Sequence, residues 1–92
     1  MSLRSCSNNG RKGFKWGSNG ACFTGRNARQ RALEQGVASE LESRREGNQF
    51  DFKSFTTISD LEFYNALVSS EANSHEIMVI LATRKVFNND SQ

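Results

Sequence analysis

The sequence predicts an α+β fold, with an N-terminal β-hairpin packed on a long helix and a strand–helix–strand unit in a small sheet after it. Three observations lead to this prediction. Two short aromatic runs flank a Gly-Ser-Asn-Gly segment, a long run of good helix formers follows them, and strand-like and helical hydrophobic patterns then alternate. The 92 residues are enough for one domain. We therefore expect a single small domain over residues 1–92, made of a basic hairpin–helix head (1–47) and an acidic strand–helix–strand half (48–92).

The first predicted element is a hairpin over residues 13–24. Glycine and asparagine tolerate the positive φ angles of tight turns, so residues 17–20 fit its loop, and this loop sets Phe14 opposite Phe23. Side chains alternate between the two faces of a strand. One face of the hairpin is therefore aromatic and holds Phe14, Trp16, Ala21 and Phe23. A lone hairpin is marginally stable in water, so we expect this face to cover another element.

The second predicted element is a helix over residues 27–46. Leu33, Val37 and Leu41 recur every four positions among good helix formers. Gly36 lies in the middle of this pattern, where it costs about 1 kcal/mol relative to alanine. A glycine at such a place indicates the close approach of another element, and the aromatic hairpin face is the simplest candidate.

Two strands are predicted in the second half, over residues 49–53 and 76–87. The first alternates polar and apolar residues, as a half-buried strand does. The second holds the run Ile77–Leu81, which is apolar on both faces and is typical of a strand covered on both sides. With a helix between them, the two strands predict a right-handed crossover with a parallel arrangement.

The intervening helix is predicted over residues 60–70. Ser59 and Glu62 form a capping-box pattern at its start. Its apolar residues at helical spacing predict one buried face, which comprises Leu61, Tyr64, Leu67 and Val68.

The charges divide unevenly along the chain. Residues 1–33 carry seven lysines and arginines and no acid, whereas residues 34–92 carry five basic and ten acidic residues. Two explanations remain open. The two parts neutralise each other in the fold or between subunits, or the basic head serves an anionic partner.

Three arginines crowd the start of the long helix: Arg26, Arg29 and Arg31. Cations oppose the helix dipole at this end, whereas the free N–H groups there favour anions. The arginines are either solvated, paired with acids elsewhere in the chain, or part of an anion site. In the last case we expect Lys12, Lys15, Arg26 and Arg29 to lie within reach of one another.

The aromatic residues of the hairpin alternate with lysines. Trp16 and its aromatic neighbours could stack on the bases of a single-stranded nucleic acid or form a protein interface. Ordinary half-buried strands show the same alternation, so packing of Trp16 in the core is favoured. The candidate binding residues of the basic head are Arg11, Lys12, Lys15, Trp16, Arg26, Arg29 and Arg31.

Residues for catalysis or metal binding are sparse. Cys6, Cys22 and the single histidine, His75, lack the spacing of a zinc site. Two reduced thiols are favoured over one disulfide, and a thiol enzyme built on Cys22 is the weakest hypothesis because no base is near it in sequence. We expect no catalytic residues, metal, cofactor or small-molecule substrate.

No run reaches the roughly 20 apolar residues of a membrane span, and no signal-peptide pattern is seen, so we expect neither secretion nor a membrane partner.

The opening of the chain resembles the N-terminal motif of small bacteriophage-encoded proteins of poorly known function. The resemblance is confined to residues 6–36. The matching positions are Cys6, Asn9, Gly10, Gly13, Phe14, Lys15, Trp16, Gly17, Gly20, Cys22, Phe23, Thr24, Gln35 and Gly36. It implies a phage origin and a small structural or accessory role, and it brings no catalytic residues.

These observations predict a non-enzymatic, virion-associated structural or assembly component. Its basic aromatic head would bind an acidic protein surface of a phage structural protein, or DNA, and its acidic half would meet a neighbouring subunit of a homo-oligomer. The alternative is a free nucleic-acid-binding or host-takeover protein in the infected cell. The expected location is accordingly the host cytoplasm or the virion.

Overall fold

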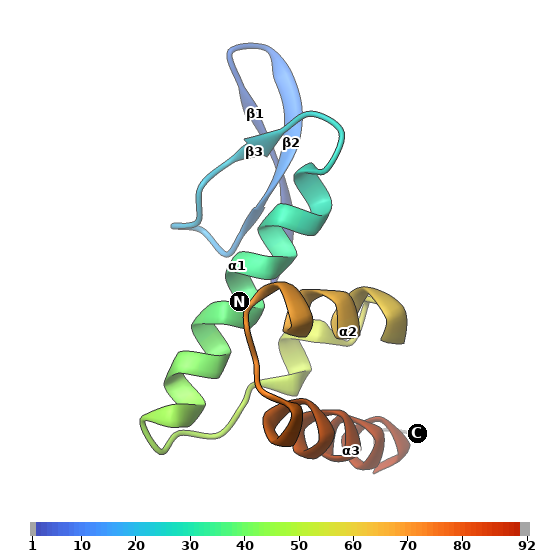
Figure 1. Ribbon diagram of the computed structural model, residues 1–92. Coiled ribbons are helices and arrows are strands. Elements are labelled where there is room, and N and C mark those ends of the chain that lie inside the picture. Colours follow the sequence, from blue (N-terminus) through green and yellow to red (C-terminus); the bar gives the residue numbers. More distant parts are fainter. Residues whose placement is uncertain (1, 91–92) are drawn as a thin grey trace.

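The computed structural model describes residues 2–90 and has an α+β architecture, as predicted (Figure 1). A three-stranded antiparallel sheet lies at one end of an elongated molecule of 40 × 29 × 22 Å, and the last helix lies at the other. The elements in chain order are β1 (Leu3–Asn8), β2 (Arg11–Trp16), β3 (Phe23–Thr24), α1 (Ala28–Arg45), the 3-10 helix η1 (Phe52–Phe55), α2 (Asp60–Ser69) and α3 (Ser74–Asp90).

The sheet is built around a long two-stranded ribbon formed by β1 and β2. Asn9 and Gly10 join the strands with positive φ angles of 53° and 80°, the conformation that a tight two-residue hairpin turn requires. This hairpin was not among the predicted elements. The predicted pairing of Phe14 with Phe23 is present, but β3 is only two residues long.

Trp16 joins the sheet to α1. Its side chain is only 5% exposed and lies against Gly36, where any Cβ atom would come within 2.7 Å of Cε3 and closer still to Cδ2 and Cε2. The other side of the indole stacks on Phe55, with ring centroids 4.8 Å apart. Gly36 is thus required by the close approach of a ring, and the prediction that Trp16 packs in the core is confirmed.

The core extends from this contact through the helices. One face of α1 is buried along its length, as its four-residue period predicted, and the aromatic residues of the second half pack against it. The main buried members are Leu33, Val37, Leu41, Phe50, Phe55, Ile58, Phe63, Leu67 and Ile80. Phe55 and Phe63 meet edge to face with centroids 5.5 Å apart.

The predicted strand–helix–strand unit is wrong. Residues 49–53 form no strand but lead into η1, which turns the chain so that Phe50 and Phe55 are both buried. Residues 76–87 lie within α3. Of the apolar run that suggested a strand, Ile80 is buried whereas Met78 is 63% exposed, the pattern of a helix with one covered face.

The start of α3 explains why the run is helical. The side chain of Asn73 accepts a hydrogen bond from the Glu76 N–H (2.8 Å), and the Glu76 carboxylate accepts one from the Asn73 N–H (3.0 Å). These two reciprocal hydrogen bonds are equivalent to those of a capping box. Arg45 of α1 then donates two 2.7 Å hydrogen bonds to the same carboxylate. These bonds hold the pKa of Glu76 at about 2, chiefly through Arg45.

The helix α2 begins at the predicted capping box but buries a different face. Ser59 and Glu62 exchange the expected hydrogen bonds. The covered side chains are Phe63, Ala66 and Leu67, whereas Leu61, Tyr64 and Val68 are exposed. Burial of Leu67 is as predicted, but the prediction was wrong for Leu61, Tyr64 and Val68, because the stripe through Phe63 and Leu67 points at the aromatic core.

A buried arginine fastens α3 to the segment before α2. Arg84, 5% exposed, donates hydrogen bonds to the carbonyls of Phe55 (3.1 Å) and Ile58 (2.9 Å) and to the carboxylate of Asp60 (3.3 Å). Its guanidinium also lies 4.6 Å from the centroid of Phe63. No helix within residues 2–90 has the length and apolar character needed to cross a membrane.

Candidate anion-binding surface

One face of the ribbon is basic and partly open to solvent: Arg4, Asn8 and Arg11 are exposed, Cys6 and Lys15 are half-buried, and Gly13 is buried. Trp16 packs on α1, so alternation along the strands turns the other side of β1 and β2 away from the helix. The register pairs Arg4 with Lys15 and Asn8 with Arg11 on that side. We call this side the outward face; its residues are Arg4, Cys6, Asn8, Arg11, Gly13 and Lys15.

The end of the ribbon stands clear of the helices (Figure 1). All six residues from Ser7 to Lys12 are exposed. We call this segment the tip. Its side chains are short polar groups and cations: two asparagines, a serine, Arg11 and Lys12. Lys12 points to the side opposite Arg11, so the tip is basic on both faces.

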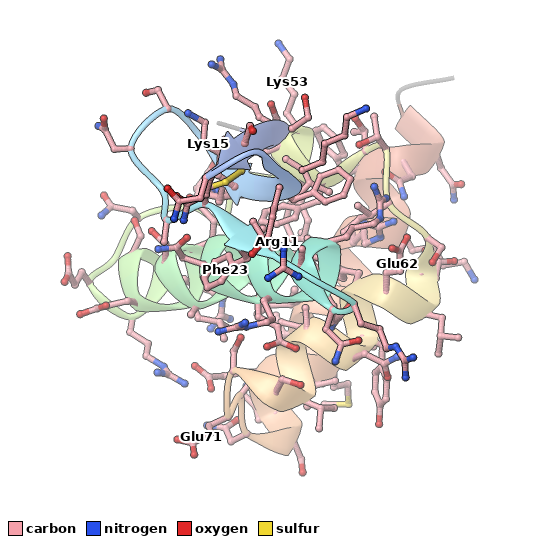
Figure 2. The ribbon with its side chains drawn as sticks, turned by 90° about the horizontal axis from the view of Figure 1, so that it is seen from above. Arg11, Lys15, Phe23, Lys53, Glu62 and Glu71 are labelled. Carbon is pink, nitrogen blue, oxygen red and sulfur yellow. A yellow bond between two sulfur atoms is a disulfide. The ribbon has the colours of Figure 1, made fainter. Side chains whose placement is uncertain are left out.

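Arg4 and Lys15 make a cross-strand pair of like charges. Like charges directly opposite each other destabilise a sheet, by up to about 1 kcal/mol. Within residues 2–90, neither cation has an acidic partner, and neither do Arg11, Lys12 and Arg26. In Figure 2 the labelled Lys15 lies beside the strands and Arg11 in front of β3 and the start of α1, whereas Glu62 and Glu71 lie on the side of the view that holds the helices α2 and α3. The positive charge of the ribbon is therefore left for solvent or a partner.

Arg26 adds a further cation beside the ribbon. Because β3 runs antiparallel to β2 and pairs with Gly13 and Phe14, the chain that follows β3 continues toward the tip. Arg26 is exposed in this connection. The first turn of α1 carries no acid, and Asn27 makes no side-chain capping hydrogen bond. The first turn of α1 therefore supplies no carboxylate of its own to Arg26.

Arg29 belongs to the fold and not to this surface. Its Nε donates a 2.9 Å hydrogen bond to Glu62 of α2. That bond, together with the Ser59 N–H, lowers the pKa of Glu62. Lys12 and Lys15 also leave opposite faces of β2. The four side chains expected to converge, Lys12, Lys15, Arg26 and Arg29, therefore do not form one cluster.

The aromatic residues of the head are engaged internally. Trp16 is in the core, and Phe14 and Phe23 are half-buried on the side facing α1. Arg31 is exposed, with its guanidinium 4.8 Å from the centroid of the Phe23 ring. The sequence-predicted residues that remain exposed without an acidic partner are Arg11, Lys12 and Arg26, and Arg4 joins them; Lys15 also has no acidic partner but is half-buried.

Sequence reasoning left Arg4 out because β1 was not predicted. The Asn9-Gly10 dipeptide was the available signal, since Asn-Gly between two short runs is a strong indication of a hairpin. With β1 paired to β2, Arg4 comes opposite Lys15.

A disulfide connects the ribbon, next to its tip, to the chain before β3. Cys6 of β1 and Cys22, just before β3, are bridged across 16 positions of sequence. The prediction of two reduced thiols is therefore wrong. The sequence places the cysteines far apart, and only the pairing of both outer strands with β2 brings them together. Because Cys22 is bridged, it is not the free thiol that the enzyme hypothesis needed.

Other kinds of site find little support in the described part of the chain. Residues 2–90 hold no group of three side chains suited to a metal ion. An open groove of about 730 Å³ lies at the far end from the tip, between the loop after α1 and α3. Its lining is largely apolar and aromatic, including Phe50, Phe52, Val79 and Phe87.

Comparisons with protein-family models, with curated proteins and with solved structures found no match for this chain.

Proposed function

We propose that this chain is a non-enzymatic binding protein that recognises an anionic partner through its ribbon and the start of α1. The observation that carries the proposal is the like-charged pair Arg4 and Lys15 on the outward face, together with the unpaired cations Arg11, Lys12 and Arg26. This arrangement costs the fold stability and leaves a concentrated positive field at one end of the molecule. A partner that neutralises the charges explains why such an arrangement is kept.

The partner we propose is a component of a phage particle, either an acidic protein surface or packaged DNA. The resemblance of residues 6–36 to phage-encoded proteins supports this role. The disulfide between Cys6 and Cys22 supports it independently. Disulfides persist in oxidising surroundings and are rare in the reducing cytosol. A particle released from the cell meets such surroundings, whereas a protein that acts free in the infected cell does not.

Charge reversal on the outward face tests the binding. Arg4→Glu places opposite charges across the strands, so we expect it to weaken binding while it leaves stability unchanged or slightly higher. The assay is the salt concentration that elutes the protein from heparin, a polyanion. Lys53→Glu is the matched control, because Lys53 is an exposed cation of η1, outside the ribbon.

We expect Arg4→Glu to elute at clearly lower salt than the control variant. Equal shifts for both variants would show that retention follows net charge alone and would contradict the proposed surface. Thermal melting of both variants checks that the fold is intact.

The location has its own test. Mass spectrometry of purified particles of the encoding phage should find the chain at a fixed, stoichiometric copy number. Its absence from particles, with abundance in infected cells, would favour the alternative of a free nucleic-acid-binding or host-takeover protein.

A further inference from the structure

We infer that the anionic ligand of this surface is duplex DNA and that the tip of the ribbon enters its major groove. This inference rests on the proposed function and names its ligand. It is carried by the shape of the ribbon, by the side chains at the tip, and by the burial of the aromatic residues that a single strand would need.

The shape of the ribbon fits a groove. The major groove of B-DNA is about 12 Å wide and admits a two-stranded β-ribbon. Paired strands lie about 4.8 Å apart, and the two residues on each side of the turn, with the turn itself, extend about 7–10 Å, close to the groove depth of about 8.5 Å. The segment Ser7 to Lys12 is exposed throughout, so both strands are free of other elements at this end (Figure 1). The tip thus has the width and the reach that the groove requires.

The side chains of the tip are those that read base edges. Asparagine pairs with adenine and arginine with guanine through two hydrogen bonds each in the major groove. Asn8 and Arg11 lie directly opposite each other on the outward face, and Asn9 is exposed in the turn. An acidic protein surface would use the arginine and lysine of the tip but gives no comparable role to Asn8; Asn9 is already accounted for by the turn.

Cations suited to phosphate contacts flank the tip. The exposed Arg4 and the half-buried Lys15 lie farther along the outward face, beyond the bridged Cys6, four residues or about 13 Å from Asn8 and Arg11. Arg26 is exposed in the connection beside β2. Phosphate contacts of this kind fix the orientation of a protein on the duplex, whereas the base contacts provide specificity.

A single strand is a poorer ligand for this surface. Proteins that bind single strands stack bases on exposed aromatic rings. Here Trp16 is 5% exposed and held between Gly36 and Phe55, and Phe23 lies under Arg31. The outward face itself carries no aromatic residue. A single strand would then be bound by charge alone, without stacking of its bases on aromatic rings.

The experiment is fluorescence anisotropy over a range of salt concentrations with three probes: a labelled 20-base-pair duplex, one of its strands alone, and labelled poly-glutamate. Two double variants are compared with the unmodified chain. Arg4→Gln with Lys15→Gln removes two proposed phosphate contacts, and Lys53→Gln with Lys85→Gln removes two exposed cations of the other half.

We expect the unmodified chain to bind the duplex at least tenfold more tightly than the single strand. Each phosphate contact to duplex DNA contributes about 0.9 to the slope of log affinity against log salt, so the Arg4 and Lys15 variant should reduce that slope by about 1.8. The control variant should reduce it by much less. Methyl green, which occupies the major groove, should displace the protein from the duplex, and netropsin, which occupies the minor groove, should not.

The possible results distinguish failure of this inference from failure of the proposed function on which it rests. Equal or tighter binding to the single strand, or displacement by netropsin alone, would overturn the inference and leave binding of a polyanion intact. Tight binding to poly-glutamate without binding to the duplex would do the same and point to an acidic protein. Failure to bind any of the three probes would overturn both.

Discussion

The contact between Trp16 and Gly36 makes a sharp prediction for the substitution Gly36→Ala. In an exposed helix the change would stabilise the protein by about 1 kcal/mol, through helix propensity. Here the new methyl group would overlap three atoms of the indole, and the ring cannot retreat because its other face stacks on Phe55. Overpacking of a core costs about 1–3 kcal/mol. Since three ring atoms are affected, we take the upper part of that range and expect a net loss of about 1–2 kcal/mol.

The assay is thermal unfolding followed by circular dichroism. For a domain of this size, 1 kcal/mol shifts Tm by about 4–8 °C, so Gly36→Ala should lower Tm by roughly 5–15 °C. Gln35→Ala, at the exposed neighbouring position, should change stability by no more than about 0.5 kcal/mol. In a Trp16→Leu background, which removes the ring, the effect of Gly36→Ala should change sign and become stabilising. An increase in Tm for Gly36→Ala alone would refute the packing described here.

Three further predictions concern the bonds that hold the fold. Reduction of the Cys6–Cys22 bridge should lower the free energy of unfolding by about 3 kcal/mol, the usual value for a loop near this length, as measured by urea denaturation with and without reductant. Glu76 has its pKa lowered to about 2, so its contribution is complete above the unfolded pKa near 4.5 and is lost as pH falls toward 2. Glu76→Gln should therefore flatten the loss of stability in that pH range, and an unchanged acid profile would contradict the role given to this carboxylate. Arg84→Met should lower the free energy of unfolding by at least about 1–3 kcal/mol, because it leaves two buried carbonyls unpaired. Asp60→Asn should lower it by under about 1 kcal/mol, because that carboxylate is exposed. Equal losses for the two variants in chemical denaturation would contradict the role given to the Arg84–carbonyl hydrogen bonds.

Much of the first half could be predicted because its signals are local. The four-residue period of α1 and the glycine within it are visible in the sequence, and so is the pairing of Phe14 with Phe23. The strand β1 was missed because its alternation is weak: Leu3 is its one large aliphatic residue. The positive charge of the candidate surface could likewise be predicted, since it depends only on composition.

The rest depends on contacts between distant segments. The β-branched run in α3 favours a strand locally, and its helical form is fixed by the cap at Asn73 and by the bond from Arg45. Likewise, composition cannot reveal that Arg29 is paired with Glu62 while Arg4 faces Lys15. Which cations are free to bind is therefore decided by register and by helix packing.

The disulfide has a mechanical consequence for a ribbon that holds a large ligand. β3 pairs with β2 at only two residues, so its hydrogen bonds alone would resist little force. The Cys6–Cys22 bridge adds to them a covalent connection between β1 and the chain that enters α1. Force applied at the tip is then transmitted to α1 through a covalent bond, so the ribbon resists separation from the helices when a ligand pulls on it.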